Sequence, residues 1–235
     1  MVAPIAQDQS RYDGFIHSLA ADLKPVRRLP PPGWRALLWL ALVAAVAFTL
    51  AAVADRPAVE ARLTAAPDIW LAAIGSALTM VLAAIAAFEL SLPDRSPLWA
   101  LLPLPAAVLW LGASGAGCLR IWLVPGTHAA VLNDSKDCIA FILALSIPLS
   151  ALLLGMLRQG HTLRPGLTAA VAGFASAAAA ATLLVFFHPY DASATDLVVH
   201  VVAVALVIVA NRAYGGRLLQ AASRSGRAEA FRGEI

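Results

Sequence analysis

The feature that most constrains this chain is a pair of long uncharged segments separated by one short turn. The first runs from Cys138 to Leu157 and the second from Gly166 to Phe187. About 20 apolar residues in a helix cross the roughly 30 Å hydrocarbon core of a bilayer. The turn between them, Arg158 to Pro165, is too short to hold a domain. The sequence therefore predicts two antiparallel helices that cross a membrane as a hairpin.

Four further apolar segments accompany this hairpin. They are Ala36 to Ala54, Ile69 to Phe88, Pro97 to Leu119, and the short segment between Asp196 and Arg212. Hydrophobic residues make up 60% of the chain and charged residues only 13%, against about 25% charged in soluble domains. A signal peptide is a competing interpretation of the first segment, but the long polar leader before it favours an uncleaved helix. We therefore expect an all-α fold, a six-helix transmembrane bundle preceded by a short cytoplasmic amphipathic helix.

The basic residues indicate how the bundle is oriented. Six crossings place both termini on one side, together with the turn that carries Arg158 and Arg164. Of the 17 lysines and arginines, four fall on the opposite side, so thirteen remain on the side of the termini; the four are Arg56, Arg62, Arg120 and Lys136. Such a bias predicts that both termini are cytoplasmic. We divide the chain into a partner-binding segment (1–35), a membrane domain (36–215) and a cytoplasmic tail (216–235).

The leader, residues 1–35, contains an apolar stripe at helical spacing. Its members are Tyr12, Phe15, Ile16, Leu19 and Leu23, separated by three or four positions. Ser10 is the expected N-cap, and Pro25 ends the helix. No soluble domain is available to cover this stripe. It therefore either lies on the inner membrane surface or fits a groove on a cytoplasmic partner, with Phe15 among the anchors.

Few ionisable residues fall inside the membrane segments, although catalysis and ion transport usually need them there. Asp196 and His200 share a helical face, which suits either a hydrogen-bonded pair or part of a metal or proton site. No phosphate-binding loop, zinc spacing or nucleophile elbow is found, so we expect no catalytic residue, metal site or cofactor.

Two other classes of membrane protein remain as alternatives. A small transporter or channel would need broken helices, for which Pro103, Pro105 and Pro148 are candidates, but no midplane carboxylate accompanies them. A haem or quinone redox protein would need facing histidines, and only His200 lies inside a predicted helix.

Two cysteines, Cys118 and Cys138, fall toward the outer side of the bundle. In an oxidising compartment they could form a disulfide or a thiol pair that senses metals or oxidants. As two small apolar residues they would only pack. The sequence leaves both interpretations open.

Small residues recur along one face of the fifth segment. They are spaced four apart, at Ala169, Gly173, Ala177 and Ala181. A face of this kind lets helix backbones approach closely. We therefore expect this helix to pack tightly inside the bundle.

Three stretches resemble a known family. They are LAADLKPVRRL (Leu19 to Leu29), the hairpin from Cys138 onward, and NRAYGGRLL (Asn211 to Leu219). Each is similar to the corresponding region of the NrsF-like proteins, six-helix anti-sigma factors of the bacterial inner membrane that regulate extracytoplasmic-function sigma factors negatively. The resemblance spans most of the chain.

The resemblance implies a function and residues for it. The leader would hold an extracytoplasmic-function sigma factor at the membrane, without contacting nucleic acid, and release it on an envelope, metal or oxidant signal. The sigma-binding residues would be Phe15, Ile16, Leu19, Leu23, Val26, Arg27 and Arg28. The signal-sensing residues would be Cys118 and Cys138. In the family a second cysteine follows a histidine in the last outer loop, whereas here Pro189 follows His188, which leaves Cys118 as the candidate partner.

Overall fold

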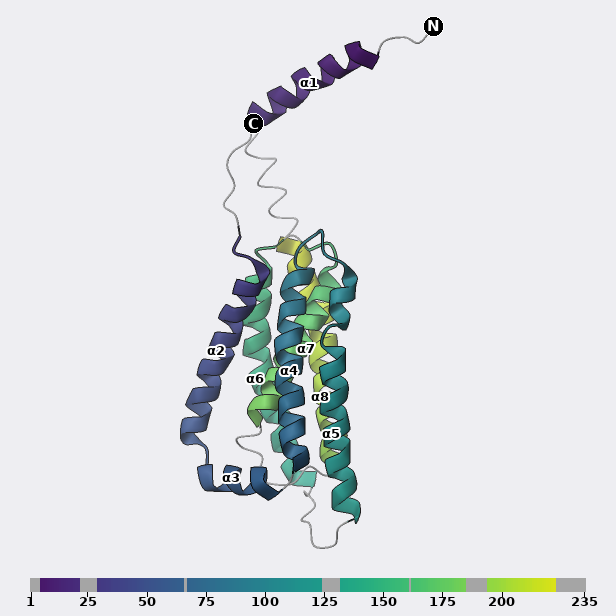
Figure 1. The fold of residues 1–235 in the computed structure, drawn as a ribbon. Coiled ribbons are helices and arrows are strands. Elements are labelled where there is room, and N and C mark those ends of the chain that lie inside the picture. Colours follow the sequence, from purple (N-terminus) through teal and green to yellow (C-terminus); the bar gives the residue numbers. More distant parts are fainter. Residues whose placement is uncertain are drawn as a thin grey trace.

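A computed structural model describes residues 5–21, 29–65, 67–123, 132–160, 162–184 and 194–222, and within these residues it is helical and contains no strand (Figure 1). The helices are α1 (Ile5–Ala21), α2 (Pro32–Val53), α3 (Arg56–Ala65), α4 (Pro67–Leu90), the 3₁₀ turn η1 (Pro97–Leu101), α5 (Leu104–Leu123), α6 (Leu132–Leu157), α7 (Pro165–Leu184), α8 (Ala194–Ala210) and the π-helical segment η2 (Asn211–Gly215). After η2 the chain continues as an α-helix to Ala222.

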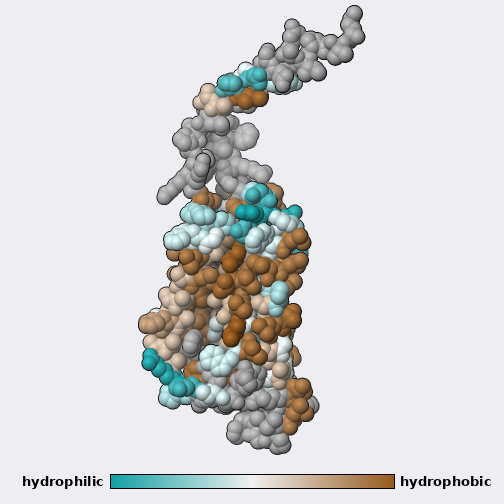
Figure 2. Space-filling model, in the orientation of Figure 1, coloured by the Kyte–Doolittle hydropathy of each residue, from teal (hydrophilic) through white to brown (hydrophobic). Residues whose placement is uncertain are grey.

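Six helical spans are long and apolar enough to cross a membrane. They are Pro32–Val53, Ile69–Leu90, Pro97–Gly117, Cys138–Leu157, Pro165–Leu184 and Leu197–Ala222. On the face seen in Figure 2, apolar side chains form a band across the middle of the bundle, and hydrophilic residues gather toward its ends. The predicted all-helical fold with six crossings is confirmed, and its helices are those of a multi-pass membrane protein.

Helix α7 occupies the centre of the bundle. Within its apolar stretch 72% of the residues are buried, and it packs against α4, α6, α8 and η2. All four small residues of the predicted face are buried. A Cβ atom added at Gly173 would lie only 2.7 Å from Cβ of Asn211. The absence of a side chain therefore sets the distance between α7 and the last crossing.

Helix α4 packs against α7 on one side and α5 on another. A Cβ atom at Gly75 would come within 2.7 Å of the Trp110 backbone nitrogen, so α4 and α5 approach closely at this glycine. The third crossing is interrupted where prolines were expected to disturb it. It consists of the 3₁₀ turn η1 followed by α5, and the break contains Pro103. Pro148, by contrast, lies inside α6.

The last crossing is longer than the apolar run alone predicts, because η2 carries the helix past Gly215 and Gly216. Both glycines lie in close packing, since an added Cβ would lie 2.8 Å from a Leu154 methyl group and 3.2 Å from Cα of Gly166, respectively. The buried Asn211 side chain donates to Ser150 Oγ at 3.1 Å and to the Val207 carbonyl at 2.9 Å. Thus η2 is held between α6 and α7.

Candidate functional site: the leader and the end of the bundle that carries it

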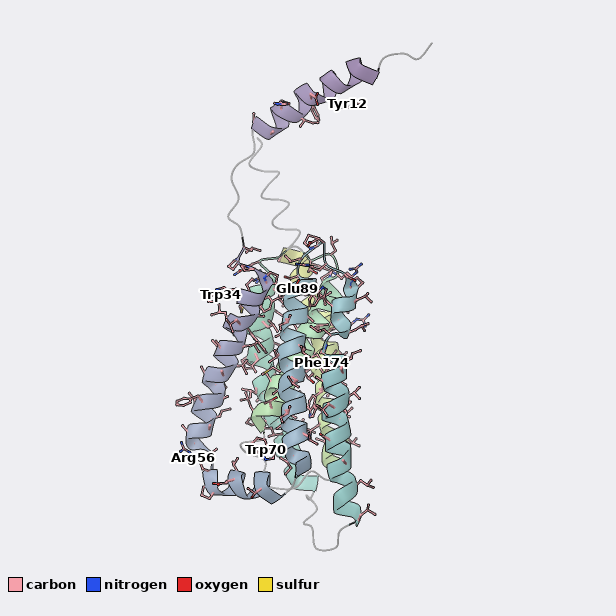
Figure 3. All side chains as sticks on the ribbon, viewed as in Figure 1. Tyr12, Trp34, Arg56, Trp70, Glu89 and Phe174 are labelled. Atoms are coloured by element: carbon pink, nitrogen blue, oxygen red, sulfur yellow. The ribbon has the colours of Figure 1, made fainter. Side chains whose placement is uncertain are left out.

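The described part of the leader is a helix with an uncovered apolar face. Tyr12, Phe15 and Ile16 are 60%, 63% and 57% exposed, and Figure 3 shows Tyr12 on α1 away from the bundle. The helix begins at Ile5, so the predicted cap at Ser10 is wrong. Ser10 lies inside α1, because residues 5–9 contain neither glycine nor proline and extend the helix toward the N-terminus.

The other predicted sigma-binding residues are less fully described. Leu19 lies within α1, which continues the stripe of Phe15 and Ile16 along the helix, but its side chain is outside the described set. The remaining four residues fall in the range 22–28, outside the described residues; they are Leu23, Val26, Arg27 and Arg28. Their roles stay predictions.

Helix α2 connects the leader to the bundle. It begins at Pro32, with Pro31 as the N-cap, so it starts earlier than the apolar run. Proline suits the first helical turn, where its fixed φ is already helical and its missing N–H costs nothing. Trp34 follows and is 63% exposed. We call the end of the bundle where α2 begins the leader end, and the opposite end, which α3 crosses, the α3 end (Figure 1).

Two side chains fasten the first half of α2 to the bundle. Arg35 is buried, donates from Nη2 to the Met156 carbonyl at the end of α6, and places its guanidinium 5.0 Å from the centre of the Phe88 ring. Trp39 is fully buried and donates from Nε1 to the Leu149 carbonyl at 3.3 Å. The carbonyl and the aromatic ring stabilise the arginine charge inside the protein.

The rest of α2 is loosely packed. Its buried residues all lie between Pro32 and Val43, and they are Arg35, Ala36, Trp39 and Val43. In its second half Phe48 is 79% exposed and Val53 is 74% exposed. The helix that carries the leader is therefore anchored at the leader end, and its later residues are partly buried or exposed.

Two threonines join the turns at the leader end. Thr162 and Thr168 both donate to the Leu90 carbonyl, at 3.1 and 3.2 Å, and their hydroxyl groups lie 2.9 Å apart. Leu90 is the last residue of α4, so these bonds satisfy a carbonyl that has no partner within its own helix. A Cβ at Gly160 would lie 2.9 Å from the Ser91 carbonyl oxygen. The turns after α4 and α6 therefore form one packed layer.

The acidic group at this end is largely shielded. The side chain of Glu89 is 14% exposed, and its Oε2 lies 2.9 Å from Nε of Arg95. Figure 3 shows Glu89 near the start of α2, at the leader end. The ion pair fits an interfacial position for this carboxylate.

The predicted sensing residues lie on different helices. Cys138 in α6 is 5% exposed. It belongs to a buried cluster with Ile142, Ala180, Leu184 and Ala203. Cys118 lies in α5, and its side chain is outside the described set. Pairing between the two cysteines stays a prediction.

Sequence reasoning missed the inward role of Arg35, which it counted among the flanking basic residues. The spacing of α2 residues in the sequence does indicate this inward face. Arg35, Trp39 and Val43 are four residues apart and so lie along one helical stripe. A stripe that combines a tryptophan with small and branched residues indicates the face that packs on neighbouring helices.

The fold and this site together define a multi-pass helical membrane protein that presents an exposed amphipathic helix at one end of its bundle. A comparison of the sequence with protein families identifies the protein's family. The chain belongs to the NrsF family, described as "Negative regulator of sigma F", whose family model matches residues 19–220. Its membership of this family identifies it as a negative regulator of a sigma factor. Searches among curated proteins and among solved structures found no match.

Proposed function

We propose that this chain is an anti-sigma factor of the bacterial inner membrane. Its leader binds an extracytoplasmic-function sigma factor and keeps it from RNA polymerase until a signal at the α3 end releases it. The family supplies the class of partner. The thirteen basic residues assigned to the side of the termini favour a cytoplasmic leader end, where a sigma factor would meet it.

The observation that carries this proposal is the uncovered apolar face of α1. Tyr12, Phe15 and Ile16 are each more than half exposed and are spaced as one side of a helix. An amphipathic helix binds a protein groove through anchors at this spacing. Leu19 and Leu23 continue the stripe toward the membrane, and in our proposal Val26 extends it.

The basic pair that follows gives the leader its polarity. Arg27 and Arg28 come directly after the apolar stripe. In a protein complex they would meet acidic residues at the rim of the groove, where charges mainly affect association rate and specificity. The apolar anchors would supply most of the affinity.

The leader assignment is tested by changing Leu19 and Leu23 together to Asp in the full-length chain. Two carboxylates on the apolar face would have to be desolvated in the groove. We expect the sigma factor to be lost from co-purification out of native membranes, and transcription of its target promoter to rise at least about tenfold. The matched control changes His17 and Ala21 to Asp, on the opposite face of the same helix. Wild-type promoter activity in the Leu19 and Leu23 variant, at equal protein level, would remove the anchor role.

Helix α6 offers a route from the α3 end to the leader. It contains buried Cys138 in its first half, and its later carbonyl groups at Leu149 and Met156 accept hydrogen bonds from Trp39 and Arg35. A displacement of α6 near the cysteine would therefore act on the part of α2 that adjoins the leader. This continuity supports a coupling between the two ends.

The sensing role is tested with Cys138→Ser in a promoter-reporter strain exposed to a metal or an oxidant. We expect the induction of the target promoter to fall several-fold, because the hydroxyl group replaces the redox-active and metal-binding thiol. Cys118→Ser is the companion variant, and equal losses in the two would support a thiol pair. Full induction in Cys138→Ser would leave this residue with a packing role alone.

A further inference from the structure

Five exposed arginines gather at the leader end of the bundle. We call them the arginine face, and they are Arg95, Arg158, Arg164, Arg212 and Arg217. They come from the turn after α4, the turn after α6, η2 and the helix beyond it. The hydrogen bonds from Thr162 and Thr168 to the Leu90 carbonyl join the end of α4, just before the turn with Arg95, to the segment that carries Arg164. The face is thus supported by packed backbone.

Few described acidic groups offset this charge. Near the arginine face these are Glu89, which is largely shielded, and exposed Asp94. Five arginines less two carboxylates leave a net charge of three positive units among these residues. At the α3 end, α3 and its entry carry Asp55, Arg56, Glu60 and Arg62, whose charges cancel. Net positive charge therefore lies at the arginine face and not on α3.

The positive charge extends over the middle of the bundle's end. Arg164 directly precedes α7, the central helix, and its backbone N–H donates to Thr162 Oγ1 at 3.2 Å. The stem of Arg212 lies beside the first turn of the same helix, 3.9 Å from a Cβ placed on Gly166. The N-terminus of α7 adds the positive end of its dipole at this point. Two of the five arginines, Arg164 and Arg212, therefore lie at the start of the central helix.

This position distinguishes a protein partner from lipid. Lipid headgroups surround a bundle at its rim, whereas α7 is flanked by α4, α6 and α8. An anionic surface that covers the start of α7 must approach from the aqueous side. The leader brings such a surface close, because the eleven residue steps from Ala21 to Pro32 span at most about 40 Å. A domain of about 100 residues has a radius of gyration of about 13 Å, so a partner bound to α1 stays within reach of the face.

We propose that the arginine face is a second contact surface for the sigma factor held by the leader, and that it binds an acidic patch on that protein. The inference rests on the proposed function and extends it from the leader to the bundle. Exposed charges of this kind raise the association rate and orient the partner. The leader binds the sigma factor, and the arginine face attracts the acidic patch of the sigma factor to the end of the bundle.

The sigma factor is first recovered by co-purification with the wild-type chain. The test then measures the rate at which it associates with the full-length chain in phosphatidylcholine nanodiscs. Arg164→Gln combined with Arg212→Gln removes the central charges from exposed positions. We expect the association rate to fall about three- to tenfold at low salt and the difference to vanish at about 0.5 M salt. Arg56→Gln, at the α3 end, is the matched control and should bind like wild type. A second pair, Arg158→Gln with Arg217→Gln, should give a smaller decrease.

Other outcomes would overturn the inference. Wild-type rates and salt dependence in both arginine pairs would show that the face does not contact the sigma factor. An effect that appears only in nanodiscs containing phosphatidylglycerol would assign the arginines to lipid headgroups. The leader is judged separately with the Leu19 and Leu23 double variant. If that variant binds normally, the leader assignment fails, while a slower association in the arginine pairs would still support the face.

Discussion

Helices α2 and α7 are both apolar and long enough to cross a membrane, but they are packed in opposite ways. In α7, 72% of the residues in the apolar stretch are buried, against 17% in α2. Alanine and glycine dominate α7, and large side chains dominate the exposed face of α2. Length and hydropathy thus predict a crossing, whereas side-chain size decides which crossing lies at the centre.

The difference in packing between α7 and α2 also bears on function. The central helix has buried neighbours on several sides and a glycine that admits no side chain. Helix α2, which carries the leader, is fastened at Arg35 and Trp39 and is otherwise partly buried or exposed. An element that must respond to a signal is expected to come from the weakly held part of a structure. Of the two helices, the less buried one carries the leader, and the leader joins it at its fastened end.

The largest effect is expected from Gly173→Leu, which tests the close packing of α7. Even a Cβ at this position would lie 2.7 Å from Asn211, so α7 and η2 would have to separate. We expect a loss of about 3 kcal/mol in the free energy of unfolding, measured by denaturant titration in detergent micelles. Gly155→Leu is the control, because nothing lies within 4 Å of a Cβ there. Equal stability of the two variants would contradict the central role of α7.

A smaller effect is expected from Trp39→Phe, which tests the attachment of α2. The substitution removes the hydrogen bond to the Leu149 carbonyl and part of a fully buried ring. We expect a loss of about 1–2 kcal/mol in the same titration. Trp34→Phe serves as control, because Trp34 is 63% exposed and its change should stay within about 0.5 kcal/mol. A Trp34 effect as large as that of Trp39 would argue against the anchor.

The smallest effect is expected from Thr162→Val, which tests the layer of turns at the leader end. Valine keeps the shape but removes the hydrogen bond to the Leu90 carbonyl and the acceptor of the Arg164 backbone N–H. Since Thr168 still donates to that carbonyl, we expect a loss of about 1 kcal/mol. Thr49→Val, at an exposed position on α2, should be near neutral. No loss in Thr162→Val would mean that water replaces the missing hydroxyl.

The sequence predicted those parts of the fold that depend on local patterns of apolar and small residues. Apolar runs located the six crossings, and the four-residue spacing of Ala169 and Gly173 marked a face that is indeed buried. Pro103 lies at the break between η1 and α5. Each of these features depends on neighbours within a few turns of the same helix.

The features that sequence did not predict depend on distant residues. Arg35 finds its partner 121 positions away, at Met156, and its spacing to Trp39 indicates the packed helix face but not that partner. The π-helical segment η2 forms where Asn211 and the glycines pack on α6 and α7, and it has no hydropathy period of its own. For the candidate site, the stripe on α1 was readable from spacing, but the arginine face required knowing which helix is central.

The alanine-rich character of α7 has a consequence for how the protein is made. Its apolar stretch has a lower mean hydropathy than those of α2 and α6, since alanine contributes less to lipid partitioning than leucine or valine. Its buried hydroxyl-bearing residues, Thr168 and Ser176, add to the cost of lipid exposure. During synthesis α7 should therefore leave the translocation channel together with α6, which emerges just before it. The hairpin is then the unit of membrane insertion, and the central helix of the finished bundle depends on its predecessor to enter the bilayer.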